Sequence, residues 1–127
     1  MVATLSTIVI DAHDVGRLAD FWCQVLGWSR TDDIEPDGAI EITDPARPSA
    51  VSLLFEPVPE HKVVKNRLHL DIRPFGVNQA DELERLLALG ARRADVGQGD
   101  QTWFVLSDPE GNEFCLLRGR ADAPALL

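Results

Sequence analysis

The residues with the clearest capacity for chemistry lie in segment 67–72, Arg-Leu-His-Leu-Asp-Ile, where polar and apolar side chains alternate. This alternation is typical of a half-buried strand and predicts that Arg67, His69 and Asp71 lie on the polar face. An imidazole beside a carboxylate can work as an acid–base pair, or it can form a structural hydrogen-bonding ladder. His69 and Asp71 are therefore catalytic candidates, and Arg67 and His69 are ligand-binding candidates, with the structural ladder as the alternative.

Other side chains offer weaker signals. Trp103 alternates with Phe104 and could stack on a flat ligand, with plain packing as the alternative. Ser52 is expected to line the part of a pocket that the first half of the chain forms. His13 and His61 have no neighbouring motif, and we assign them no role. The sequence has no glycine-rich phosphate loop, nucleophile elbow or Cys-x-x-Cys pair.

Two helices are expected to position these residues. Apolar side chains at helical spacing predict a helix over 14–26, with Asp14 as its cap and Gly27 as its stop. A second helix is predicted over 78–89, ending at Gly90. Its expected apolar side consists of Ala80, Leu83, Leu86 and Leu87.

Eight strands are expected around these helices, and their order repeats. They are predicted near 5–10, 28–32, 39–43 and 51–56, and again near 67–72, 91–95, 101–106 and 113–118. Because Gly27 and Gly90 lie 63 positions apart, we infer an internal duplication of a βαβββ unit. The repeats are expected at about 1–58 and 66–120, with a linker over 57–66 and a fraying tail after Gly119. The fold class is therefore α+β.

Composition limits what the chain can be. With 127 residues, 45% of them hydrophobic, it is long enough for one domain with a single core. A formal net charge of −9 disfavours nucleic acid and anionic lipid as partners. The first 60 residues hold 11 acidic and 3 basic side chains, which could attract a cationic ligand or simply keep that surface solvated. Two cysteines and no recognisable signal peptide lead us to expect a cytoplasmic protein with free thiols.

Three motifs in this order resemble the vicinal oxygen chelate superfamily, which contains glyoxalase I, bleomycin-resistance proteins and extradiol dioxygenases. They are the helix signature over 14–27, the segment 65–71 and the turn Asp-Pro-Glu-Gly-Asn at 108–112. Together they resemble the glyoxalase-like domain branch, which is common among small bacterial proteins. The resemblance covers nearly the whole chain and implies an incomplete barrel that encloses a cup, and a homodimer.

The resemblance also implies where a metal would bind. Its three ligand positions fall on Thr7, His69 and Cys115. Threonine is not a usual ligand for a tight divalent site, and a Cys/His pair would need outside help to hold zinc. Because Cys115 stands among apolar residues, packing is its simpler role. We therefore expect no metal and no cofactor, with a divalent metal at His69 as the alternative. The expected ligand-binding set is Thr7, Ser52, Arg67, His69, Trp103 and Cys115.

Two functions compete at this point. The first is a metal-free protein that binds a small organic molecule in the cup, for example an antibiotic-like or cationic compound. The second is an enzyme, either a metal-dependent lyase, isomerase or dioxygenase, or an acid–base catalyst that uses His69 and Asp71. Because function resides in the site rather than in the fold, the sequence leaves catalysis open.

Overall fold

The computed structural model describes residues 1–33, 35–94 and 103–119. The chain divides into two compact units, Met1–His61 and Lys62–Leu127, and the boundary falls within the expected linker. The N-terminal unit contains β1 (Thr7–Ala12), α1 (Val15–Leu26), β2 (Ser29–Arg30), β3 (Ile40–Thr43) and β4 (Ser52–Pro57). The C-terminal unit contains β5 (Leu70–Ile72), α2 (Gln79–Leu89), β6 (Arg92–Arg93), β7 (Phe104–Ser107) and β8 (Glu113–Leu116).

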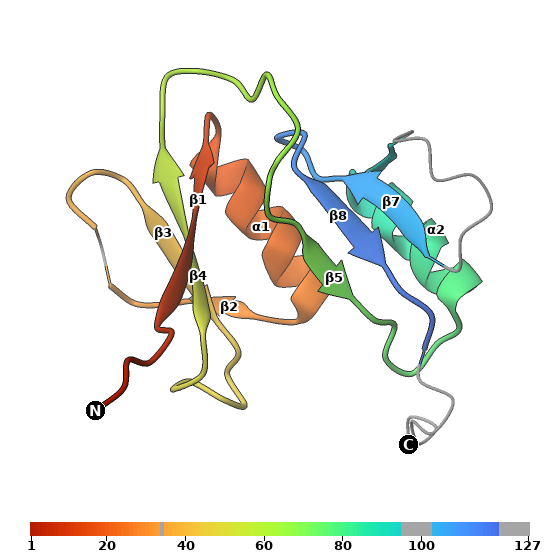
Figure 1. The fold of residues 1–127 in the computed structure, drawn as a ribbon, viewed down its shortest axis with the longest axis horizontal. Coiled ribbons are helices and arrows are strands. Elements are labelled where there is room, and N and C mark those ends of the chain that lie inside the picture. Colours follow the sequence, from red (N-terminus) through yellow and green to blue (C-terminus); the bar gives the residue numbers. More distant parts are fainter. Residues whose placement is uncertain (34, 95–102, 120–127) are drawn as a thin grey trace. The chain divides into compact units, whose positions relative to one another are not determined.

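The two units have the same topology (Figure 1). Each holds an open four-stranded sheet, with strand order β1-β4-β3-β2 in one and β5-β8-β7-β6 in the other. The first and last strands of each unit pair in parallel, and the remaining pairs are antiparallel. The predicted α+β class and the duplicated βαβββ unit are therefore confirmed.

Helix α1 forms where its caps and its apolar spacing require it. The Asp14 side chain accepts a hydrogen bond from the Arg17 backbone N–H at 3.2 Å, and Gly27 ends the helix in the left-handed conformation at a φ of 69°. Phe21 and Trp22 are buried, and their rings pack edge to face with centroids 5.2 Å apart. Helix α1 packs against β3 and β4, so its buried side chains cover one face of the N-terminal sheet.

Helix α2 has the predicted limits but not the predicted apolar side. Asn78 caps its start, and Gly90 at a φ of 118° ends it. Leu86 is fully buried, whereas Leu87 is 37% exposed and Ala80 is also exposed, so that part of the prediction was wrong. Glu82 is buried instead. Its carboxylate is paired with the Arg85 guanidinium, with Nε–Oε1 and Nη2–Oε2 distances of 2.6 and 2.9 Å. Among the described residues, no helix is long and apolar enough to cross a membrane.

Strand β5 is shorter than the sequence predicted. The expected strand over 67–72 is reduced to Leu70–Ile72, and Leu68, which alternation placed on the same side as Leu70 and Ile72, is 84% exposed. The reason is that pairing with β8 begins only at Leu70, opposite Phe114. The other strands lie near their predicted positions, but residue 95, residues 101–102 and the tail beyond 119 lie outside the described residues.

Candidate functional site

A cluster of three polar side chains lies on the C-terminal sheet, and we call it the polar trio: His69, Asp71 and Cys115. The parallel register of β5 and β8 pairs Asp71 with Cys115, while His69 directly precedes β5. One potential metal-ligand atom from each residue lies within 4.8 Å of the other two. The His69 Nδ1 atom is 3.8 Å from Asp71 Oδ1. Since His69 and Asp71 side chains are 43% and 52% exposed, the trio is open to a ligand from solvent.

The Cys115 thiol is not activated as a nucleophile. Burial raises the pKa of Cys115, and the charge of Asp71 and a hydrogen bond with its carboxylate raise it further, whereas Lys65 lowers it. The thiol is therefore protonated at neutral pH. In a nucleophilic cysteine site the histidine stands next to the thiol and the carboxylate behind it, but here Asp71 interacts with both other groups. The trio offers hydrogen-bond donors and acceptors rather than a thiolate.

The polar residues of the N-terminal sheet form a hydrogen-bonded ladder. The Ser52 hydroxyl donates to Glu41 Oε2 at 2.7 Å. Its oxygen lies 3.0 Å from the Thr7 hydroxyl, which must donate because the Ser52 proton is already used. Ser52 is only 4% exposed. The structure thus places Thr7 and Ser52 side by side and gives their hydroxyls a structural partner.

The sheet registers show which residues correspond between the two repeats. Val9 pairs with Leu54 on the N-terminal sheet, and Asp71 pairs with Cys115 on the C-terminal sheet. Leu54 and Cys115 are also at equivalent places in the β3–β4 and β7–β8 hairpins. The N-terminal counterparts of Asp71 and Cys115 are therefore Val9 and Leu54. Two of the three polar groups have apolar counterparts, so the trio belongs to one repeat only.

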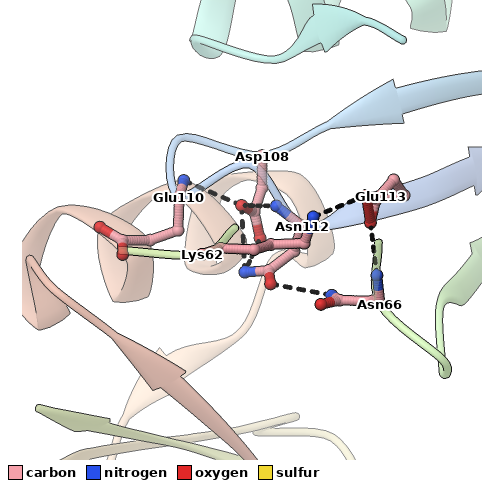
Figure 2. A network of polar contacts seen from close by, with 6 residues as sticks. All are labelled: Lys62, Asn66, Asp108, Glu110, Asn112 and Glu113. Atoms are coloured by element: carbon pink, nitrogen blue, oxygen red, sulfur yellow. Dashed lines mark hydrogen bonds and ion pairs between the residues drawn. The ribbon is translucent and has the colours of Figure 1, made fainter. Parts of the chain in front are cut away.

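A polar clamp holds the segment that leads to His69 (Figure 2). It consists of Lys62, Asn66, Asn112 and Glu113. The Glu113 carboxylate accepts from Lys62 Nζ at 2.7 Å and from the Asn66 backbone N–H at 3.1 Å, while Asn66 Nδ2 donates to Asn112 Oδ1 at 2.8 Å. Burial alone would raise the pKa of Glu113, but these hydrogen bonds and the Lys62 charge lower it overall. Because Asn66 is fixed, the chain three residues before His69 has a defined position.

Asn112 of the polar clamp belongs to the turn between β7 and β8. Asp108 is 4% exposed, and its Oδ1 atom accepts from the backbone N–H groups of Glu110 at 2.9 Å and Asn112 at 3.0 Å. Asn112 Nδ2 also donates to Asp108 Oδ2 at 3.0 Å, and Gly111 supplies the positive φ of 87°. The turn motif noticed in the sequence is thus the support of Asn112 and, through it, of Asn66 (Figure 2).

Two predicted site residues, Arg67 and Trp103, lie outside the polar trio. Arg67 is exposed and precedes β5, where strand alternation no longer fixes its direction. Trp103 is half-buried immediately before β7. A feature that the sequence analysis missed is the pair His13 and His61, whose ring centroids are 4.1 Å apart. No local motif signals this contact, because the two residues are far apart in sequence.

The metal set implied by the resemblance does not fit these residues. A threonine hydroxyl is a poor ligand for a divalent metal, and that of Thr7 is engaged with Ser52. The trio is a different set, made of an imidazole, a carboxylate and a thiol. Those three groups are among the usual ligands of zinc, and Asp71 is the member that the resemblance did not point to.

Comparison with known proteins establishes the family. The model of the glyoxalase-like domain family matches residues 7–117, a span that includes both repeats. The chain therefore belongs to the glyoxalase-like domain family, within the vicinal oxygen chelate superfamily. No protein with a curated description matches the sequence.

Solved structures share the fold. The fosfomycin resistance protein FosX from Mesorhizobium loti has a TM-score of 0.69 at 13% identity, covering 95% of each chain. A glyoxalase/bleomycin resistance protein/dioxygenase family enzyme from Burkholderia phytofirmans PsJN has a TM-score of 0.64 at 20% identity, covering 90% of this chain and 97% of its own. A variant of FosX from Listeria monocytogenes, in complex with Mn(II) and dihydroxypropylphosphonic acid, has a TM-score of 0.69 at 14% identity, covering 96% and 94%. At these identities the likeness shows the fold alone.

Proposed function

We propose that this protein binds a small organic molecule on the C-terminal sheet, with the polar trio as its anchor. The observation that carries the proposal is the gathering of three chemically different polar groups within 4.8 Å: Asp71 on β5, Cys115 on β8 and His69 just before β5. Two of them, His69 and Asp71, are accessible from solvent. Binding sites for small molecules typically combine apolar surroundings with a few convergent polar groups. The expected ligand therefore carries both hydrogen-bond donors and acceptors.

The surroundings of the trio support a ligand of mixed polarity. His69 and Asp71 lie at the exposed side, and the Cys115 thiol faces Asp71 from the buried side. Leu70 and Ile72, the neighbours of Asp71 in β5, are half-buried. The structure of the Listeria protein contains a small polar organic compound, which supports a small ligand here. A homodimer and a cytoplasmic location are parts of the same proposal.

Thermal-shift screening tests this function, because a ligand that binds only the native protein raises its unfolding temperature. We expect at least one compound from a panel of metabolites and antibiotics to stabilise the chain. His69→Ala should weaken binding of that compound by roughly tenfold, the effect of losing one good hydrogen bond. His13→Ala is the matched control and should leave the affinity unchanged. An affinity that is the same in both variants would remove His69 from the site.

An acid–base enzyme is the second candidate, favoured by the distance of 3.8 Å between His69 Nδ1 and Asp71 Oδ1. At this distance a small movement would bring the two groups into a hydrogen bond, which would fix the orientation of the imidazole. A bound compound that is converted to a product, as detected by mass spectrometry, would support this candidate. Conversion that persists in His69→Ala would exclude His69 as its acid or base.

A further inference from the structure

Two histidines from distant parts of the sequence meet at one end of the N-terminal sheet. His13 directly follows β1, and His61 lies four residues after the end of β4. The parallel ladder brings the two segments together, because Ala12 pairs with Pro57 and the Val58 N–H donates to the Ala12 carbonyl at 2.9 Å. The imidazole rings have centroids 4.1 Å apart with 35° between their planes, and both residues are exposed. A ligand from solvent can therefore reach both rings.

The separation of the rings fits two imidazoles bound to one metal ion. Metal–nitrogen bonds of about 2 Å place the centroids of two imidazoles bound at a right angle about 4.5 Å apart. The observed 4.1 Å is slightly shorter, so a small rotation of two exposed side chains would complete the geometry. Right angles between neighbouring nitrogen ligands are typical of the square-planar sites of Cu²⁺ and Ni²⁺. The geometry therefore favours these two metals over tetrahedral zinc.

The charge around the histidine pair favours a cation. Asp11, two residues before His13, lies directly opposite Glu56 in the register of β1 and β4. In the part of the chain that the structure describes, neither carboxylate forms an ion pair. Because like charges at opposite positions of a sheet repel, a cation bound nearby would offset their repulsion. The negative surplus of the N-terminal unit acts in the same direction.

We propose that His13 and His61 form a metal site for Cu²⁺ or Ni²⁺, in which water completes the coordination. The site belongs to the N-terminal unit and shares no residue with the polar trio, so it does not depend on the proposed ligand function. A bound metal would fix His61 against the end of β1. The next residue, Lys62, is already held by Glu113 at 2.7 Å. Metal binding would therefore fix the chain immediately before the polar clamp.

Titration calorimetry with Ni²⁺ tests the site, since Ni²⁺ does not oxidise the two thiols. The protein used carries His69→Ala, which removes the third histidine of the sequence and leaves only the proposed pair. We expect this protein to bind one equivalent of Ni²⁺. Adding His13→Ala or His61→Ala should weaken binding by about tenfold or more, because one imidazole cannot chelate the metal. Circular dichroism of each variant checks that the fold is retained.

Chemical modification identifies the ligands in the unchanged protein. Diethyl pyrocarbonate reacts with an imidazole nitrogen that a bound metal would cover, and mass spectrometry of the peptides measures each histidine separately. One equivalent of Ni²⁺ should slow the modification of His13 and His61 and leave the rate at His69 as it was. Ni²⁺ binding that is equally strong after His13→Ala, protection of His69 alone, or no protection of the pair would overturn the proposal.

Discussion

Cys115 and Cys23 are held in the thiol form by their surroundings. Burial raises the pKa of both, and each has one nearby carboxylate that adds to the effect, Asp71 for Cys115 and Asp20 for Cys23. Lys65 and Arg30 respectively act in the opposite direction. A thiol of this kind reacts slowly, because the thiolate is the nucleophilic form. The cysteines are therefore protected from casual oxidation as well as from alkylation.

Asp71→Asn should accelerate alkylation of Cys115 by iodoacetamide at neutral pH. The substitution removes a negative charge that raises the thiol pKa, so a larger fraction of Cys115 becomes thiolate. Mass spectrometry of the modified peptides measures both cysteines in one experiment. Cys23, in the other unit, is the internal control and should keep its rate. A Cys115 rate that does not change would show that Asp71 does not control this thiol.

Two Asp-Pro turns occupy equivalent places in the two repeats, but they are built differently. Asp108 is buried and accepts hydrogen bonds from two backbone N–H groups and from Asn112 Nδ2. Asp44, at the equivalent hairpin position, accepts one bond from the Ala46 backbone N–H at 2.9 Å. In the part of the chain that the structure describes, the C-terminal turn supports a further network, which reaches Asn66 (Figure 2).

Asp108→Ala should therefore cost more stability than Asp44→Ala. We expect a loss of about 3 kcal/mol at Asp108, where buried donors lose a charged partner, and about 1 kcal/mol at Asp44. Urea unfolding of the two variants gives both free energies. Equal losses would contradict the view that the C-terminal turn is a structural support of the site.

Local signals predicted the elements better than their contacts. Asp14, Gly27 and Gly90 correctly marked helix ends, because capping depends on residues within one turn. The capping role of Asn78 was not predicted. The length of β5 was overestimated, because the start of its ladder depends on β8, more than 40 residues later.

The candidate site was predicted in part. Alternation placed His69 and Asp71 on the same side, and the family resemblance pointed to Cys115. The pairing of Asp71 with Cys115 could not be predicted, because it follows from the register of β5 against β8. The Lys62 and Asn66 contacts with Glu113 were missed for the same reason, since they join residues about 50 positions apart.

At the scale of the whole molecule, charge is divided unevenly between the two units. Residues 1–61 carry 11 acidic and 3 basic side chains, whereas residues 62–127 carry 10 and 9. The negative field of the protein therefore originates in the N-terminal unit. The polar trio lies in the nearly neutral unit, so we expect ligand preference at the proposed site to depend on the trio's own groups more than on the net charge of that unit.

Glu113 links the stability of the molecule to pH. Its pKa is lower in the folded protein than its ordinary value of 4.5, so the unfolded chain binds the proton more tightly. The stabilisation is complete above pH 4.5 and is lost as the pH falls through the lowered pKa. Glu113→Gln should be less stable than the unchanged protein at pH 7, with a difference that shrinks in acid. Urea unfolding at pH 7 and in acid measures the free energy of unfolding of both proteins. A difference between them that stays the same at both pH values would contradict the role of Glu113.

The duplicated sheets let one half change its chemistry while the other stays as it is. Val9 and Leu54 occupy the positions that Asp71 and Cys115 hold in the second copy, and the strand order around them is the same. Since these side chains lie on paired strands whose backbone ladder does not depend on them, two substitutions change the face from apolar to polar without changing the strand order. After a duplication of the βαβββ unit, one repeat can therefore change its side chains while the other repeat keeps its own.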